Sequence, residues 1–276
     1  MKSFQTITKL SLNKDARSIT IPASILAIED SAFSEFFNLK SIYVDPNNFQ
    51  FSSIDGILFT KNFETLLCFP PKHHLLNYEI PASVTSIGNS AFYYCCKLQS
   101  IMIPASVASI GKNAFSNCLD LELIVVNNKN LQFASIDSIL FTKNYDTLLC
   151  FPPKHHLLNY RIPTQVTSIN DFAFCNCSNL QSITIPASVT SIGESVFSEC
   201  SHLESINVDS CSLHFTSIDG ILFTKNLERL LCFPPKHHIS HYTIPTGVTS
   251  IAKLAFSHCF NLQSITIPAS VASIDD

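Results

Sequence analysis

The chain has 276 residues, of which 46% are hydrophobic and only 14% are charged, whereas an average globular protein has about 25% charged residues. The formal net charge is −4 and the basic residues are scattered along the sequence, so composition predicts no nucleic-acid partner. The sequence contains no apolar run of the roughly 18 residues that a membrane-spanning helix needs and no signal peptide at its start, so we expect no membrane insertion by this segment.

Internal repeats dominate the sequence. Residues 51–81 return almost unchanged at 133–163 and 215–245, an interval of 82 residues. Each of these units contains a shorter period, because the Ile-Pro pairs at Ile80 and Ile103 lie 23 residues apart. The step from Val44 to Ile80 is 36 residues. We interpret the longer step as one ordinary coil with an insertion.

A single coil contains several predicted elements. Residues 98–103 alternate apolar and polar positions, which predicts a short strand. Pro104 ends that strand, residues 107–110 are a second extended piece, and Gly111 suits a bend. Residues 112–118 are long enough for one or two helical turns.

One coil of this length cannot bury its apolar side alone, so the coils must stack. We predict a single domain over residues 1–276: a solenoid, mainly β with short helical turns, with ten stacked strands. Each 36-residue step is expected to carry a hairpin, with strands at 57–60 and 65–69 and a turn at Lys61-Asn62, that projects from the edge of the solenoid. The last coil stops before its second half, so we expect a C-terminal end without a cap, in a chain that continues or pairs with another copy.

The repeats resemble a known family. The segments IPASVTSIGNSAFYYC, IPASVASIGKNAFSNC and IPASVTSIGESVFSEC, at residues 80–95, 103–118 and 185–200, are similar to BspA-like leucine-rich repeats of the Treponema pallidum class. The resemblance implies a leucine-rich-repeat solenoid of 23-residue coils. It also implies a surface or extracellular adhesion role, often toward host matrix proteins or other cells.

Three copies of CFPPKHH, the first at Cys68 to His74, contain the residue types that bind zinc. Successive copies are three coils apart, which is about 14 Å at about 4.8 Å per strand. Metal–nitrogen bonds of about 2 Å cannot bridge that distance. We therefore interpret the motif as a loop after the hairpin and predict no metal and no cofactor.

The chain has eleven cysteines, and those of the AFxxC pattern are predicted to be buried thiols beside a core ladder of phenylalanines. Cys96, Cys175 and Cys211 depart from the pattern and are predicted to be more reactive. No nucleophile elbow, metalloprotease helix or paired carboxylates stand outside the repeat. We predict that the chain is not an enzyme and has no catalytic residues.

The concave sheet of a solenoid is the usual binding surface. Its outward positions are mostly small and polar, but near the middle of the chain they are Glu79, Met102, Leu123, Val125 and Arg161. We predict that these residues bind a protein: a host matrix protein, a cell-surface protein or a second copy. The solenoid would then be displayed at the cell surface or outside the cell. Two alternatives remain open: an intracellular protein-interaction scaffold, and multivalent binding by the three hairpins.

Overall fold

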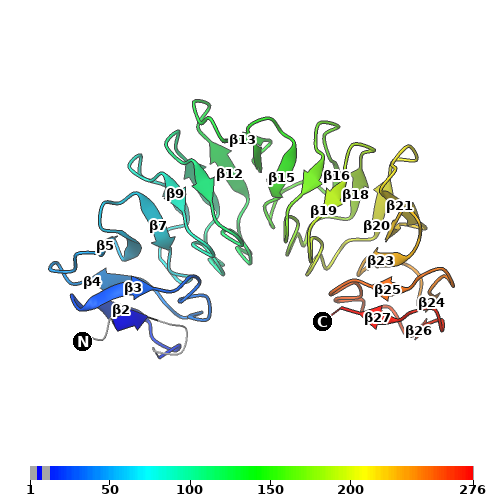
Figure 1. Cartoon of the computed structure of the whole chain (residues 1–276), viewed down its shortest axis with the longest axis horizontal. Helices are drawn as coiled ribbons and strands as arrows, with labels where there is room; N and C mark the ends of the chain where they lie inside the picture. Colours follow the sequence, from blue (N-terminus) through cyan, green and yellow to red (C-terminus); the bar gives the residue numbers. More distant parts are fainter. Residues whose placement is uncertain (1–4, 8–12, 276) are drawn as a thin grey trace. The chain divides into compact units, whose positions relative to one another are not determined.

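The computed structural model describes residues 5–7 and 13–275, and the chain divides into two compact units, residues 1–143 and 144–276. Each unit is a stack of coils whose short strands follow one another in chain order (Figure 1). The chain is thus a β-solenoid, as predicted. Throughout the described residues, strands and turns make up the regular structure and there is no helix.

The first set of strands corresponds to the predicted alternating segments. In β10 (Ser100–Ile103), for example, Ile101 and Ile103 are buried and Met102 between them is exposed. The ten described strands of this set are β2 (Ser18–Ile21), β4 (Ser41–Val44), β8 (Asn77–Glu79), β10 (Ser100–Ile103), β12 (Leu123–Val126), β16 (Asn159–Arg161), β18 (Ser182–Ile185), β20 (Ser205–Val208), β24 (His241–Thr243) and β26 (Ser264–Thr266).

Strands one 23-residue step apart pair in parallel and in register, so Ile101 lies opposite Tyr78 on one side and Ile124 on the other. The number of strands agrees with the prediction, but they do not form one sheet. Residues 1–143 contain the sheets β2–β4 and β8–β10–β12, and residues 144–276 contain β16–β18–β20 and β24–β26.

The sheet is interrupted at a 36-residue step because a turn of the insertion takes the place of the next strand. The carbonyl of Gly56 accepts a hydrogen bond from the Ile42 N–H at 2.8 Å. Gly56 has a φ of 79°, and a Cβ there would lie 2.7 Å from the Cβ of Ser41, so glycine relieves both strain and crowding. Ser138 holds the same place beside Ile124 with a φ of 66°, which is uncommon for a residue other than glycine.

Each insertion has three strands rather than the predicted two. The strands of the three copies are β5 (Phe51–Ile54), β6 (Ile57–Thr60) and β7 (Thr65–Cys68), then β13 (Phe133–Ile136), β14 (Ile139–Thr142) and β15 (Thr147–Cys150), then β21 (Phe215–Ile218), β22 (Ile221–Thr224) and β23 (Arg229–Cys232). β6 pairs with β7 across Lys61-Asn62, as predicted, and β5 adds a further antiparallel strand to β6.

The prediction that the hairpin projects from the edge was wrong for its strands. Leu58, Phe59 and Leu66 have no exposed surface. β7 also pairs in parallel with β9 (Ser86–Ile87) of the next coil, so it belongs to the wall of the solenoid. The insertion therefore supplies the second extended piece of its own coil.

The second set of strands is shorter. It comprises β9, β11 (Ser109–Ile110), β17 (Ser168–Ile169), β19 (Ser191–Ile192), β25 (Ser250–Ile251) and β27 (Ser273–Ile274), and near the start of the chain β1 (Gln5–Ile7) pairs with β3 (Ile25–Ile28). Serine hydroxyls link successive members, for example Ser109 Oγ to Ser86 Oγ at 2.8 Å. These hydroxyl contacts repeat the 23-residue register on the surface of the coil.

The segment predicted to form helical turns is instead a run of tight turns. From Ala91 to Cys95 the odd-numbered residues donate their N–H groups to the carbonyl three residues earlier. The N–H groups of Ser90, Phe92 and Tyr94 donate to the following coil at 2.8–3.1 Å. Ser90 and Tyr94 have φ values of 55° and 62°, so the helical conformation cannot propagate through them.

A ladder of phenylalanines fills the core. Phe92 lies between Phe69 and Phe115 with ring centroids 5.3 and 5.5 Å away. In the other unit Phe174 contacts Phe151 at 5.1 Å, and the same spacing continues beyond it. Phe69 and Phe151 come from the CFPPKHH motif, so the phenylalanine of this motif supplies the ladder member that its longer coil would otherwise lack.

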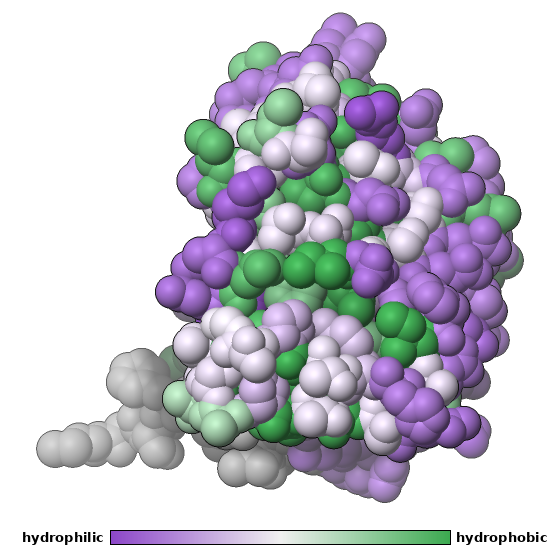
Figure 2. All heavy atoms as spheres, turned by 90° about the vertical axis from the view of Figure 1, so that its right-hand side faces the viewer, coloured by the Kyte–Doolittle hydropathy of each residue, from purple (hydrophilic) through white to green (hydrophobic). Residues whose placement is uncertain are grey.

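The outer surface mixes apolar and polar residues, as the low content of charged residues requires. Figure 2 looks onto the side at the right of Figure 1 and shows hydrophobic residues interleaved with hydrophilic ones. In the last coil Ile265, Ile267 and Ile274 are exposed and Val271 is half-buried. The described part of that coil therefore leaves the apolar side chains of its strands accessible.

We expect Phe92→Ala to lower the free energy of unfolding by about 3–5 kcal/mol, because it removes a fully buried ring that has ladder neighbours on both sides. Phe49→Ala is the matched control: Phe49 is 80% exposed, and its loss should cost less than about 0.5 kcal/mol. Urea unfolding followed by circular dichroism measures both. Equal losses of unfolding free energy in the two variants would contradict the stabilising role of the phenylalanine ladder.

Candidate functional site

One row of outward-facing residues crosses β8, β10 and β12. Met102 lies opposite Glu79 on one side and Val125 on the other. Leu123 is on the same face of β12, two residues before Val125. Because neighbouring strands are about 4.8 Å apart, these side chains form one group. The structure thus brings together four of the five predicted residues.

The apolar members of this group are accessible: Met102 and Leu123 are 44% exposed and Val125 is 40% exposed. The residues at the equivalent positions 82 residues further along are Thr184, Ser205 and Asn207. The buried positions of the same strands are unchanged, Ile101 and Ile124 corresponding to Ile183 and Ile206, so the two repeats differ here on the outward face. We call Met102, Leu123 and Val125 the apolar row.

Arg161 belongs to the other unit. It is the last residue of β16, lies opposite Thr184 of β18 and is exposed. Its joint action with the apolar row therefore stays a prediction. Glu79, by contrast, lies at the end of β8 directly beside Met102 and provides a negative charge next to the apolar row.

Tyr43 was not among the predicted residues, but it occupies on β4 the outward position that Val125 occupies on β12. Tyr43 lies opposite Thr20 of β2 and is 54% exposed. The alternation that identified Met102 and Val125 also applies to the segment SIYV at 41–44. The alternation could therefore have identified Tyr43, but the 36-residue step that follows this strand hid its equivalence to Val125.

An exposed apolar residue at the same place in each insertion loop was also not predicted. Phe49, Leu131 and Leu213 are 80%, 78% and 80% exposed. The loop that carries Phe49 is held firmly, because the buried Asn48 donates to the carbonyls of Pro22 and Ile25 and accepts from two N–H groups of its own loop. Each insertion thus presents one large apolar side chain to solvent.

The histidine pairs of CFPPKHH divide into a buried and an exposed member. His73 is 2% exposed. Its Nε2 is 2.8 Å from the Asp55 carbonyl, and its Nδ1 accepts from the Leu75 N–H at 3.3 Å. Burial lowers the pKa of His73 below its ordinary value. His237 makes the same pair of contacts, with Asp219 and with the N–H two residues on. The buried histidine therefore fastens the loop to the turn of the insertion.

The cysteines of the AFxxC pattern have a structural role. Cys118 Sγ lies 3.0 Å from the carbonyl of Phe92, and Cys200 Sγ lies 2.9 Å from that of Phe174. A thiol at this position is small, apolar and able to donate a weak hydrogen bond to the preceding coil. Four of the five are buried, as predicted, and Cys259 is half-buried.

The three cysteines predicted to be reactive differ from one another. Cys211 is exposed and Cys96 is half-buried. Cys175 is buried beside Ser198, with Oγ and Sγ 3.2 Å apart, and burial raises the pKa of its thiol to about 11. The prediction for Cys175 was wrong because its side chain turns into the core instead of outward.

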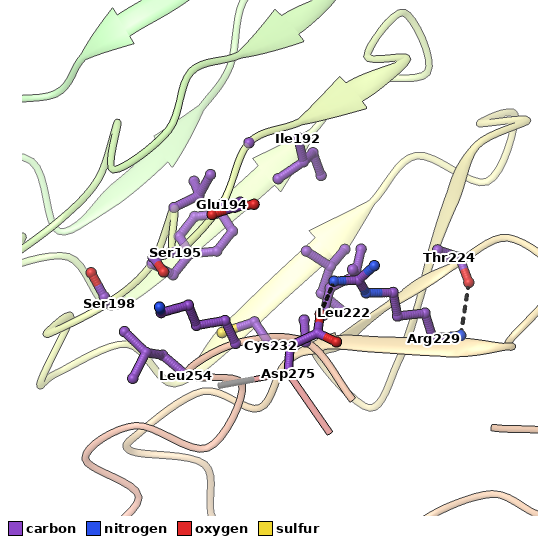
Figure 3. A pocket seen from close by; sticks show the side chains of 16 residues that line it. Ile192, Glu194, Ser195, Ser198, Leu222, Thr224, Arg229, Cys232, Leu254 and Asp275 are labelled. Carbon is purple, nitrogen blue, oxygen red and sulfur yellow. Dashed lines mark hydrogen bonds and ion pairs between the residues drawn. The ribbon is translucent and has the colours of Figure 1, made fainter. Parts of the chain in front are cut away.

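A second candidate site is a hollow of about 600 Å³ in residues 144–276 (Figure 3). Apolar side chains including Ile192 and Leu254 line it, and Arg229 and Asp275 form an ion pair across its edge. The Ser195 hydroxyl is buried and has no hydrogen-bond partner among the described residues. That hydroxyl therefore has no activating base in the part of the chain that the structure describes.

The corresponding site in residues 1–143 is almost closed, with a volume of about 50 Å³. There Ser31 Oγ, the equivalent of Ser195, is 2.9 Å from Ser90 Oγ, and Asn89 donates to Asp30 at 2.8 Å. In residues 144–276 the position of Ser90 is taken by Leu254, which cannot make this hydrogen bond. One substitution thus accounts for the unpaired hydroxyl.

Within residues 5–7 and 13–275, no group of three or more histidine, cysteine or acidic side chains is arranged to hold a metal ion. The same described residues include no helix long and apolar enough to cross a membrane.

The stacked 23-residue coils, with their phenylalanine and cysteine ladders, define a leucine-rich-repeat solenoid. A family model described as BspA type leucine rich repeat region matches residues 12–68, 65–156 and 147–276, in six copies. The chain belongs to this family. Leucine-rich-repeat solenoids generally serve as non-enzymatic scaffolds for protein interaction.

Solved structures agree with the fold. A leucine-rich repeat protein from Eubacterium ventriosum is similar with a TM-score of 0.56 and 20% identity, over 91% of this chain and 66% of that one. A leucine rich cell surface protein from Faecalibacterium prausnitzii gives a TM-score of 0.55 and 26% identity, over 90% of this chain and 78% of that one. No curated protein matches the chain.

We expect Cys211 to react first with a maleimide at neutral pH, because among the residues that the structure describes it is the one exposed cysteine. Cys68 and Cys259 should react slowly, since burial raises their pKa values to about 12. Mass spectrometry of the modified peptides measures the order, and Cys211→Ser should remove the fast phase. Labelling of Cys175 as rapid as that of Cys211 would contradict the structure.

Proposed function

We propose that the chain is a non-enzymatic protein-binding module whose ligand contacts the sheet face of β8, β10 and β12. The observation that carries this proposal is the apolar row: three accessible apolar side chains on adjacent strands, where the equivalent positions of the next repeat are polar. An exposed apolar group on a soluble surface favours association with another protein. Interface energy concentrates in a few central side chains that lose their water on binding.

Display at the cell surface is part of this proposal. It is supported by membership of the BspA-type family and by the similarity to the leucine rich cell surface protein of Faecalibacterium prausnitzii. The ligand would then be a matrix protein, a protein of another cell or a second copy of the chain. Glu79 would provide a polar margin to the apolar row, and Arg161 would contribute from the second unit if the ligand extends to it.

A second surface is favoured by one specific observation. The exposed side chains of Phe49, Leu131 and Leu213 recur once in each insertion loop. Three equivalent weak apolar contacts on one chain would gain affinity through linkage. A ligand with repeated apolar sites would use these loops instead of the apolar row, and the two surfaces can be changed separately.

We expect Leu123→Glu with Val125→Lys to weaken binding of the protein ligand at least about tenfold, because charges replace two central apolar contacts. The matched control is Ser205→Glu with Asn207→Lys, which introduces the same charges at the equivalent positions 82 residues on. Proteins captured by the wild type and the control, but not by the test variant, are identified by mass spectrometry and confirmed with purified partner.

Both variants should keep the circular dichroism spectrum of the wild type, since all four positions are exposed or half-exposed. If Phe49→Ser, Leu131→Ser and Leu213→Ser together remove binding while the change to the apolar row leaves it intact, the insertion loops are the binding surface and the sheet face is not.

A further inference from the structure

The break in the sheet between β4 and β8 leaves a hollow of about 990 Å³ in residues 1–143. Its wall includes Tyr43 of β4, the turn that contains Asp55, and the loop that carries Lys72 and Leu76. The buried His73 holds that turn and that loop together through the Asp55 carbonyl. The hollow is therefore a fixed feature of the insertion.

Cationic side chains converge on this hollow from four separate parts of the sequence. They are Arg17, Lys40, Lys72 and Lys97, and we call the cavity the basic hollow. Main-chain contacts bring three of their segments together: the Lys40 N–H donates to the Arg17 carbonyl, and the Lys72 N–H donates to the carbonyl of Leu39, both at 2.8 Å. Four cationic residues that are far apart in the sequence are thus brought together by separate coils.

The charge of the basic hollow is opposite in sign to that of the whole chain. Four cations against the single carboxylate of Asp55 give a formal charge of +3 among its lining residues, whereas the chain as a whole carries −4. None of the four cations forms an ion pair with a described acidic side chain. A cleft lined by one sign of charge concentrates its field and attracts opposite charges.

Comparison with the other repeats shows that this charge is specific to the first one. Lys72 is repeated as Lys154 and Lys236, but the other three cations are not repeated. Their equivalents are Gln99 and Gln181 for Arg17, Glu122 and Glu204 for Lys40, and Asn179 and Asn261 for Lys97. In the third copy the corresponding charged positions, Glu204, Asp219 and Lys236, give a formal charge of −1. The same fold therefore forms without these cations.

Two accessible apolar side chains lie among the cations. Tyr43 is 54% exposed and Leu76 is 44% exposed, and both line the basic hollow. Their equivalents in the third copy are Asn207 and Ser240. A hollow that combines ammonium and guanidinium groups with an aromatic ring fits a ligand that has carboxylates beside an apolar side chain.

We propose that the basic hollow binds an acidic peptide segment of a protein partner, with its carboxylates toward Arg17, Lys40 and Lys97 and an apolar side chain against Tyr43 and Leu76. This inference rests on the proposed protein-binding function and names a chemistry for the partner. A peptide fits better than a sulfated glycan because the glycan would leave the apolar surfaces of Tyr43 and Leu76 without a contact.

The test uses the whole chain and a fluorescent, end-blocked hexapeptide of five glutamates and one central phenylalanine, measured by fluorescence anisotropy. The peptide should bind the wild type, and its affinity should fall as salt rises from about 50 mM to about 500 mM. A hexapeptide with glutamine in place of glutamate should not bind.

The test variant is Arg17→Gln with Lys40→Glu and Lys97→Asn, which installs the residues that the other repeats already carry at these positions. We expect it to weaken peptide binding about tenfold or more. Lys112→Glu with Lys129→Glu changes the net charge of the chain by the same amount at exposed sites outside the hollow. This control should change the affinity less than about threefold.

A further variant, Tyr43→Asn, separates a peptide from a simple polyanion. It should lower the affinity for the phenylalanine peptide by about threefold to tenfold and leave the affinity for a hexaglutamate peptide unchanged. A heparin oligosaccharide that binds more tightly than the peptide and displaces it would overturn the assignment, as would equal losses in the test and control variants or no binding by the wild type. Leu123→Glu with Val125→Lys should retain peptide binding, so failure of the proposed sheet-face function is distinguishable from failure of this one.

Discussion

The main-chain hydrogen bonds between successive coils are the constraint on which the rest of the structure depends. β10 pairs in register with β8 and β12, and even the tight turn at residues 88–95 donates every second N–H to the following coil. These bonds fix the step at 23 residues. Since buried N–H and C=O groups need partners, a coil out of register would leave part of its backbone unsatisfied. The side chains of the core and those of the surface are therefore both arranged with the same 23-residue step.

Stacking in register turns each position of the repeat into a row. Phenylalanines stack on phenylalanines, and each AFxxC thiol reaches the carbonyl of the ladder phenylalanine in the coil before it. The insertion keeps to this rule, because Phe69 and β7 occupy the places of the ordinary ladder residue and second strand. The rows of side chains that face solvent are not restricted by core packing in this way. Chemical differences between repeats are therefore found there, in the apolar row and in the basic hollow.

Much of the fold follows from sequence, because periodicity and alternation are local. The ten strands, the pairing across Lys61-Asn62 and the burial of four AFxxC cysteines were predicted in this way. The prediction of helical turns was wrong: the composition of 112–118 permits a helix, but the carbonyls of Lys112, Ala114 and Ser116 accept hydrogen bonds from the preceding coil, and these contacts between coils decide against it. The apolar row follows from alternation, whereas the basic hollow joins residues as far apart as Arg17 and Lys97, which no local pattern relates.

Native-state hydrogen exchange at the turn segments tests this account most directly. If the inter-coil bonds carry the structure, the amides of Phe92 and Phe174, which donate to the next coil, should be protected as strongly as those of Ile101 and Ile183 in the paired strands. The exposed loop residue Phe49 should exchange rapidly by comparison. Exchange at Phe92 and Phe174 as fast as at Phe49 would contradict the account, because the turns would then lie unbonded beside the sheet.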